Sequence, residues 1–316
     1  MLKNFVRALL GSTIAVALAL SLAGLPQHQE ITKVQPRHSA LPEVQEPVID
    51  WAKYTGASCL VTKEDFGFRT CPRGARNGYW DVAFIGDSHM RQYFAVLDYL
   101  ALKYKWRVTF ISKSACPVGN HSILPDHISA SCRDWNARLE KYLAKRKAFD
   151  FVINSNSAFV SHGSSRVGDA YRSTVLSEVR RGASWFVISD NPKPRVDFMD
   201  CLSQFGYSNP AACALPYSRS MTPIDIMPIA LQGIPNTYSI DLRTKFCPHN
   251  ICLPLINGRI VYRDKSHISA LFARTLVGYL DAAIPRKFKG LPDNLALRLM
   301  RASLGEAIKL PGISVH

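Results

Sequence analysis

The sequence lacks several features that would define a class of protein at once. Glycine and proline are ordinary, at 18 and 19 of 316 residues, and no internal repeat is visible. These absences exclude collagen-like and repeat architectures. Hydrophobic residues make up 47% and aromatics 10%, which argues against disorder and coiled coil. The composition predicts a globular protein with a sizeable core, in one large or two small domains.

Acidic residues are also scarce. Asp and Glu number 24 against 39 Lys and Arg, which leaves a net charge of +15. A surface of this sign favours anionic partners or an anionic membrane surface.

The beginning of the chain has the pattern of an export signal. Lys3 and Arg7 precede an uncharged stretch over residues 8–25, and a small-x-small triplet ends at Ala23. Such a triplet is a signal-peptidase motif, but the uncharged stretch is also at the short end of a spanning helix. We therefore predict that residues 1–25 are a cleaved signal peptide or a retained membrane anchor. Both interpretations place the rest of the chain outside the cytoplasm, in the periplasm, secreted or tethered.

The cysteines fit an oxidising compartment. There are eight of them, and they form four sequence-local couples: Cys59 with Cys71, Cys116 with Cys132, Cys201 with Cys213, and Cys247 with Cys252. Proximity favours disulfides within each couple, although other connectivities are open. No couple has the C-x-x-C spacing, and only the last one encloses a histidine, His249. Zinc binding is therefore the weaker alternative, and we expect no metal and no cofactor.

Composition suggests that three segments follow the leader over residues 1–25. Residues 26–75 contain a Pro-, Gln- and Glu-rich linker and an N-terminal extension, and residues 76–284 hold the main domain. Residues 285–316 form a basic tail. This tail has the composition of an amphipathic helix that docks on a membrane or a partner, or packs against the domain.

Short apolar runs alternate with amphipathic stretches in the main domain. Strands are predicted over 81–85, 107–111, 149–153, 184–188 and 237–240, with an extended piece at 258–262. Helices are predicted around 94–101 and over 134–147, 170–181 and 269–283, while 192–235 reads as an irregular insertion. This alternation predicts an α/β fold with a mostly parallel sheet covered on both faces. The reactive loops of such folds lie at the carboxyl ends of the strands.

Two motifs at that edge suggest nucleophilic catalysis. Ser88 follows the first predicted strand, and Asp264 and His267 precede the last helix. A serine hydroxyl needs a base to take its proton, and the base works best when a carboxylate fixes its tautomer. An Asp three residues before a His can reach the ring nitrogen that faces away from the serine.

These residues carry a family resemblance. Over about two-thirds of the chain, the sequence resembles the SGNH (GDSL-like) hydrolases, and within them the periplasmic SGNH domains of acyltransferase-3-type O-acetyltransferases. The matching motifs are Gly86-Asp87-Ser88-His89, Cys116-Pro117, the couple Cys247 and Cys252, and Tyr262-Arg263-Asp264-Lys265-Ser266-His267-Ile268-Ser269. The resemblance implies a three-layer α/β/α, flavodoxin-like SGNH hydrolase fold for the catalytic domain. The membrane helices of the fused proteins are not seen, so we expect a stand-alone module.

The resemblance also implies roles. Ser88 would be the nucleophile, His267 the base and Asp264 the residue that orients it. The family's oxyanion hole combines the N–H of the serine, a backbone N–H after the second strand and an Asn side chain. Ser88, Ala115 and either Asn156 or Asn154 would supply these donors here. The loop that contains Ala115 has no glycine where the family usually has one.

The resulting hypothesis is a serine O-acyltransferase, specifically an O-acetyltransferase, that modifies a cell-envelope or secreted polysaccharide through an acyl-serine. The acyl donor would come from a separate membrane acyltransferase. A carbohydrate acetyl-esterase or another GDSL-type esterase with the same residues is the alternative, and a non-catalytic glycan-binding or assembly subunit is the second. His89 is expected to shape the pocket, and His162 and His249 to lie outside the site. Nucleic acid fits poorly with an exported, cysteine-rich chain, so an acidic polysaccharide or an anionic membrane surface is the expected partner.

Overall fold

The structure, a computed structural model, describes residues 59–193, 197–205, 207–220 and 224–292. The predicted leader, most of the linker and most of the basic tail lie outside the described residues. Among the helices that are described, none is long and apolar enough to cross a membrane.

A six-stranded sheet forms the centre of the domain, in the order β1-β3-β2-β4-β5-β7. Its strands are β1 (Cys71–Gly74), β2 (Trp80–Gly86), β3 (Trp106–Ser112), β4 (Phe151–Ser155), β5 (Ser184–Ile188) and β7 (Thr237–Ile240). All neighbours are parallel except β1, which runs antiparallel to β3. The five predicted strands are therefore present. The predicted N-terminal extension adds β1 as an edge strand.

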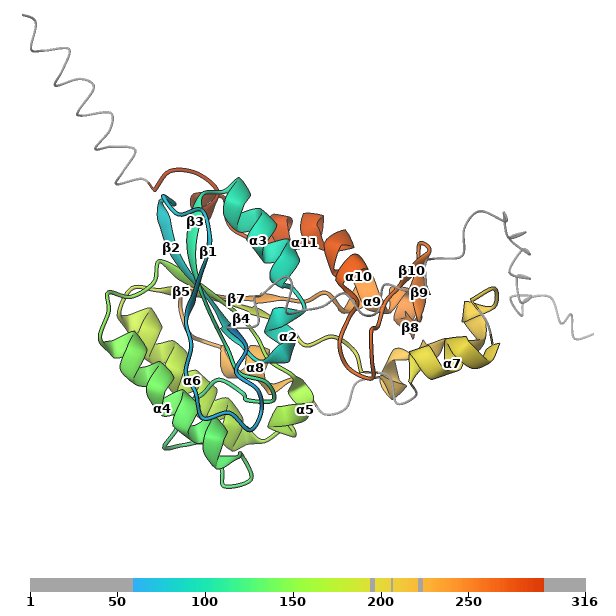
Figure 1. Ribbon diagram of the computed structural model, residues 1–316, viewed down its shortest axis with the longest axis horizontal. Helices are drawn as coiled ribbons and strands as arrows, with labels where there is room; N and C mark the ends of the chain where they lie inside the picture. Colours follow the sequence, from blue (N-terminus) through green and yellow to red (C-terminus); the bar gives the residue numbers. More distant parts are fainter. Residues whose placement is uncertain (1–58, 194–196, 206, 221–223, 293–316) are drawn as a thin grey trace, which may run out of the picture. The chain divides into compact units, whose positions relative to one another are not determined.

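Helices cover both faces of the sheet (Figure 1). One face carries α3 (Phe94–Lys103), α10 (Ala270–Thr275) and α11 (Val277–Ala283), and the other carries α4 (Ala130–Ala144) and α6 (Ser165–Arg180). Alternate strand residues point to opposite faces, so Val82 and Phe84 of β2 join one core and Ala83 and Ile85 join the other. This is the predicted three-layer α/β/α fold.

Several helix boundaries differ from the sequence predictions. Helix α4 begins at Ala130 rather than at 134, because the side chain of Ser129 caps it and accepts a hydrogen bond from the Cys132 N–H. Helix α6 begins at Ser165 instead of 170. The closing helix is two helices with a break at Leu276, in a stretch whose Thr, Val and Gly are weak helix formers.

Two loops are more ordered than expected. The stretch 192–235, predicted to be irregular, contains α7 (Phe198–Phe205), η3 (Pro210–Cys213), β6 (Leu215–Pro216), η4 (Tyr217–Arg219) and α8 (Ile226–Ala230). The extended piece near 260 is half of a hairpin between β9 (Leu255–Ile256) and β10 (Arg259–Ile260). Asn257 and Gly258 have φ of 49° and 73°, the left-handed values that a tight hairpin turn requires. The remaining short elements are α2 (Ser88–Arg91), α5 (Ala158–Ser161), α9 (Arg243–Phe246), η5 (Pro248–Asn250), β8 (Ile251–Cys252) and η6 (Arg286–Phe288).

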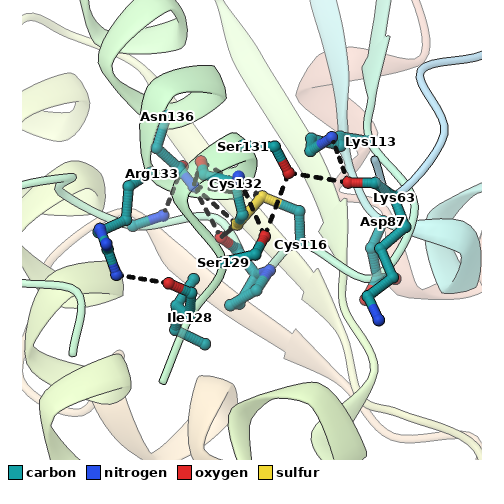
Figure 2. The surroundings of a disulfide bond; sticks show 12 residues. Lys63, Asp87, Lys113, Cys116, Ile128, Ser129, Ser131, Cys132, Arg133 and Asn136 are labelled. Carbon is teal, nitrogen blue, oxygen red and sulfur yellow. Dashed lines mark hydrogen bonds between the residues drawn. A yellow bond between two sulfur atoms is a disulfide. The ribbon is translucent and has the colours of Figure 1, made fainter. Parts of the chain in front are cut away.

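All eight cysteines are paired, and each is joined to its sequence neighbour: Cys59–Cys71, Cys116–Cys132, Cys201–Cys213 and Cys247–Cys252. Figure 2 shows the second bridge, which ties the loop after β3 to α4. Buried Asn136 reinforces it. Its Nδ2 donates to the carbonyls of Pro117 (3.0 Å) and Cys132 (3.1 Å), and its Oδ1 accepts from the Gly119 N–H (3.0 Å). The loop that leads to the active-site edge is thereby fixed.

Removal of this bridge should lower the free energy of unfolding. The Cys116→Ala/Cys132→Ala variant opens a loop with a sequence separation of 16. Loop-closure entropy in the unfolded chain predicts a loss of about 3 kcal/mol. Urea unfolding of both proteins measures it. The matched variant Cys247→Ala/Cys252→Ala opens a loop of separation 5 and should cost about 2 kcal/mol. A larger loss from the shorter loop would contradict the entropic argument.

Candidate active site

The turn after β2 presents Ser88. Asp87 caps the short helix α2, because its Oδ1 accepts the His89 N–H (2.7 Å). Its Oδ2 accepts the Ser157 N–H (2.9 Å), which ties this cap to the segment after β4. Gly86 allows the turn to pass close to β4, since a Cβ there would lie 2.1 Å from the Ser155 carbonyl oxygen. Ser88 is therefore held, half-buried, at the carboxyl end of the central strand.

The structure brings the three predicted catalytic residues into one hydrogen-bonded chain. The Nε2 of His267 lies 2.8 Å from the Oγ of Ser88, and its Nδ1 lies 2.9 Å from both carboxylate oxygens of Asp264. Asp264 Oδ1 also accepts the backbone N–H groups of Ser266 (2.9 Å) and His267 (2.8 Å). The carboxylate thus shapes the loop as well as holding the ring.

Local electrostatics favours a neutral imidazole beside the serine. Burial raises the pKa of Asp264, but the hydrogen bond and charge of His267 outweigh it and hold that pKa well below its usual range. Burial also lowers the pKa of His267. The hydrogen bond that His267 donates to Asp264 opposes this shift, whereas the positive charge of His89 adds to it. A neutral His267 with its Nδ1 proton directed at Asp264 has Nε2 free to accept the Ser88 proton.

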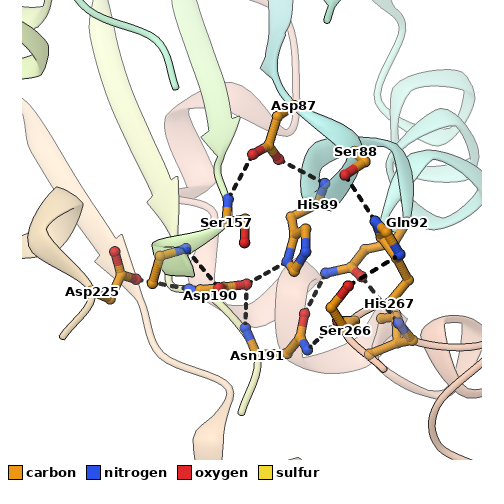
Figure 3. A network of polar contacts seen from close by, with 12 residues as sticks. Asp87, Ser88, His89, Gln92, Ser157, Asp190, Asn191, Asp225, Ser266 and His267 are labelled. Atoms are coloured by element: carbon orange, nitrogen blue, oxygen red, sulfur yellow. Dashed lines mark hydrogen bonds and ion pairs between the residues drawn. The ribbon is translucent and has the colours of Figure 1, made fainter. Parts of the chain in front are cut away.

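A second histidine–aspartate pair lies directly behind the first (Figure 3). His89 is 2% exposed and Asp190 6%, and the Nδ1 of His89 is 2.5 Å from Oδ1 of Asp190. Burial lowers the pKa of His89, but the charge and hydrogen bond of Asp190 outweigh burial and raise it to about 9. The rings of His89 and His267 are 4.9 Å apart. A buried imidazolium therefore stands next to the candidate base.

Asp190 organises a wider network. Its Oδ2 accepts the Ala158 N–H (2.7 Å), its Oδ1 accepts the Asn191 N–H (2.9 Å), and its own N–H donates to Asp225 Oδ2 (2.8 Å). The sequence reasoning did not single out Asp190. Its position just after β5, at the edge where the other candidates lie, is the signal that would have found it.

Gln92 and Asn191 hold the loop of the base in place. Gln92 Nε2 donates to Asn191 Oδ1 (2.7 Å), and Gln92 Oε1 accepts the Ile268 N–H (3.0 Å). Asn191 Nδ2 donates to the Ser266 carbonyl (2.9 Å). The two amides thus link α2 and the end of β5 to the residues on either side of His267, and the sequence reasoning missed both.

The candidates for the oxyanion hole differ in their surroundings. Asn154 is committed to the core, because its Nδ2 donates to the Ile85 carbonyl (2.7 Å) and its Oδ1 accepts the Tyr171 hydroxyl (3.0 Å). Asn156 lies just beyond β4, and its Nδ2 donates to Asn154 Oδ1 at 3.3 Å. The Oδ1 of Asn156 has no hydrogen-bond partner among the described residues, so its amide is less committed than that of Asn154, whose nitrogen and oxygen both have partners. This geometry favours Asn156 over Asn154.

Ala115 adopts the conformation that glycine would favour. Its φ is 52°, in the left-handed region, in a loop that lacks the glycine expected from the family resemblance. Arg91 of α2 donates a hydrogen bond to the Ser114 hydroxyl and so links this loop to the helix that carries Ser88. The backbone turn is therefore retained without the glycine.

The other histidines predicted to lie outside the site are exposed. His162 follows α5, and His249 lies beside the Cys247–Cys252 bridge. Within the described parts of the chain, no group of three or more His, Cys, Asp or Glu residues is arranged to hold a metal ion.

The pH dependence of activity should report the charge next to His267. The acid limb of kcat/KM follows the pKa of His267 in the free enzyme. Burial and the charges of His89 and Arg263 lower this pKa, and Asp264 raises it. The limb should therefore lie below pH 6.5. His89→Gln removes one positive charge, so the pKa of His267 rises and the limb moves to higher pH.

The double variant His89→Gln/Asp190→Asn tests this assignment, because it removes both charges of the pair. The acid limb of kcat/KM should shift less in the double variant than in His89→Gln, relative to the unmodified enzyme. Identical limbs in all three proteins, measured with a small activated ester, would rule out electrostatic coupling between the two histidines.

Comparisons with known proteins agree with the fold. The family model described as the SGNH domain fused to AT3 domains matches residues 58–282. Among solved structures, the fold is similar to the periplasmic domain of a lipopolysaccharide acetyltransferase from Salmonella ser. Paratyphi A, with a TM-score of 0.52 and 16% sequence identity. The similarity covers 75% of this chain and 98% of that one. No curated protein matches the sequence.

Proposed function

The chain belongs to the SGNH family, and on that premise we propose that it is an extracytoplasmic serine O-acyltransferase, specifically an O-acetyltransferase of a cell-envelope or secreted polysaccharide. It is an SGNH-type enzyme of acyl transfer or ester hydrolysis. The continuous hydrogen-bonded chain from Ser88 through His267 to Asp264 carries the acyl-serine mechanism, and the similarity to a lipopolysaccharide acetyltransferase domain supports a polysaccharide acceptor.

The first half-reaction forms an acyl-serine. His267 Nε2 takes the Ser88 proton while Oγ attacks the carbonyl carbon of the acyl donor. The tetrahedral intermediate collapses, the bond from carbon to the leaving oxygen breaks, and His267 returns the proton to that oxygen. Donors from Ser88, Ala115 and Asn156 would stabilise the oxyanion, each by about 3 kcal/mol.

The second half-reaction passes the acyl group to a sugar. A sugar hydroxyl gives its proton to His267 and attacks the acyl carbon, and the bond to Ser88 Oγ breaks as the proton returns to the serine. The products are a sugar ester and free enzyme, so no further co-reactant is needed. Asp264 stabilises the imidazolium in both halves.

The proposed location and partners follow from the charge and the bridges. Four disulfides are typical of an oxidising, extracytoplasmic compartment, and we place the enzyme in the periplasm, secreted or tethered by its N-terminal segment. The acyl donor would be supplied by a separate membrane acyltransferase. A net charge of +15 is compatible with an anionic acceptor or membrane surface.

Ester hydrolysis by the same residues is the alternative, and one observation favours it. The Asp264 side chain is 43% exposed and that of His267 20%, so water can reach the triad. Water in place of the sugar hydroxyl would make the enzyme a carbohydrate esterase.

Partition of the acyl-enzyme separates the two functions. The enzyme is mixed with 4-nitrophenyl acetate, with and without polygalacturonic acid or dextran, and acetyl on the glycan and free acetate are both quantified. A transferase should give acetylated glycan and release 4-nitrophenol faster as the glycan concentration rises. Acetate as the only product with every glycan would overturn the transferase and leave the esterase.

A further inference from the structure

Three exposed rings form a row next to the candidate active site. The Phe159 ring lies 5.5 Å from that of His162, and the His162 ring lies 5.8 Å from that of His127. Phe159 is 48% exposed, and both histidines are exposed. We call these three residues the ring row. An exposed apolar ring beside two imidazoles gives this surface both apolar and hydrogen-bonding groups, the combination that a ligand-binding surface offers.

A cation caps the row at its Phe159 end. The ammonium of Lys193 lies 3.6 Å from the centre of the Phe159 ring. The backbone N–H of Lys193 donates to the Ser220 carbonyl at 2.6 Å, which fixes the chain at this residue. The ammonium thus covers one face of the ring, and the pair combines an apolar ring with a positive charge at one place on the surface.

Short hydrogen bonds connect this end of the row to the catalytic residues. Ser157 and Ala158, just before Phe159, donate their N–H groups to Asp87 and Asp190 at 2.9 and 2.7 Å. Asp87 precedes the nucleophile, and Asp190 is paired with His89. Lys193 follows Asn191, whose side chain donates to the carbonyl of Ser266. Phe159 and Lys193 are therefore attached to the two segments that carry the nucleophile and the base.

The chemistry of the row matches a saccharide chain. Sugar rings present C–H faces to aromatic rings and hydroxyls to polar groups, and imidazoles accept or donate hydrogen bonds to such hydroxyls. The rings are inclined to one another by 46° and 81°, so each offers a separate contact to a polymer rather than part of one flat platform. A lysine at the catalytic end adds attraction for a carboxylate or another anionic substituent.

We infer that the ring row and Lys193 form the acceptor subsite, and that the acceptor is an extended polysaccharide with anionic groups. This inference rests on the proposed function, because it assigns the acceptor of the same reaction. The polymer would lie along His127 and His162 and enter the catalytic end past Phe159 and Lys193.

Binding is tested without turnover, in the Ser88→Ala background. Affinity electrophoresis through gels containing polygalacturonic acid or dextran measures dissociation constants for the anionic and the neutral polymer. The Ser88→Ala protein should bind polygalacturonic acid more tightly than dextran. Adding Phe159→Ala should weaken binding of both polymers by about tenfold, the equivalent of about 1.4 kcal/mol of ring contact. Adding Lys193→Gln should weaken binding of polygalacturonic acid and leave dextran unchanged.

Tyr99→Ala is the matched control, since Tyr99 is 56% exposed on α3, away from the row, and its removal should change neither constant. Equal binding by the Phe159→Ala and Tyr99→Ala proteins, or no binding of either polymer by the Ser88→Ala protein, would overturn the inference. Failure of the proposed function has a different signature. Absence of an acetyl group on Ser88 in the unmodified enzyme would remove acyl transfer, whether or not the glycan binds.

Discussion

Ser88→Ala is expected to lower the rate of 4-nitrophenyl acetate hydrolysis by at least about 10⁴-fold and to abolish the acyl-enzyme. The alanine removes the hydroxyl oxygen that lies 2.8 Å from His267 Nε2, so the base has no nucleophile to deprotonate. Rapid acid quenching followed by mass spectrometry of the peptide that contains residue 88 should show an acetyl group in the unmodified enzyme only. Ser122→Ala, at an exposed serine, is the control and should retain full activity.

The rest of the triad should behave as a unit with Ser88. His267→Ala should cost nearly as much as Ser88→Ala, and the double variant little more than either, because each change disables the same proton transfer. Asp264→Ala should cost less, since the nucleophile and the base both remain. Additive losses, or activity of Ser88→Ala within tenfold of the unmodified enzyme, would mean that another residue is the nucleophile.

Asp190→Ala is expected to cause the largest loss of stability, about 3–5 kcal/mol in the free energy of unfolding. The substitution leaves the buried His89 imidazolium without its counter-charge and leaves the Ala158 and Asn191 N–H groups without their acceptor. Urea unfolding at pH 6 measures the loss. The double variant His89→Gln/Asp190→Asn, which buries no charge, should recover part of it. An equal loss in the double variant would assign the effect to the lost hydrogen bonds from the Ala158 and Asn191 N–H groups alone.

The same pair predicts how stability depends on pH. In the folded protein, the pKa of His89 is raised from 6.5 to about 9. Protonation of His89 therefore adds fully to the free energy of unfolding below pH 6.5, and this contribution is lost as pH rises through 9. Burial raises the pKa of Asp225 to about 7 in the folded protein, from 3.8 in the unfolded chain. The stability that protonated Asp225 contributes is therefore lost as pH rises from 3.8 to 7. Stability should therefore fall between pH 6 and pH 9.

The pH dependence of stability that comes from His89 should change sign when Asp190 is removed. Burial alone lowers the pKa of this histidine, so in Asp190→Ala its titration should favour the folded state more as pH rises. Unfolding curves at pH 6 and pH 9 compare the two proteins. The gap in stability between them should narrow at the higher pH, and a gap that widens would contradict a charged His89.

The sequence predicted best what depends on local pattern. Apolar runs marked the five parallel strands, and two motifs named Ser88, Asp264 and His267. Strand β1 escaped because its four residues, CPRG, carry no apolar run, and its place depends on pairing with β3. The His89–Asp190 and Gln92–Asn191 contacts join residues 101 and 99 positions apart, so no local pattern contains them. Topology, rather than propensity, brings these groups together.

The neighbour pairing of the bridges bears on how the chain matures after export. Proteins cross a membrane pore from the N-terminus, and oxidation can begin before the chain has fully emerged. In this protein each cysteine bonds to the next one along the chain, so the partners emerge in succession. Linking every pair in order of arrival yields the native set directly. We therefore expect the enzyme to reach its oxidised form without the reshuffling that interleaved bridges require.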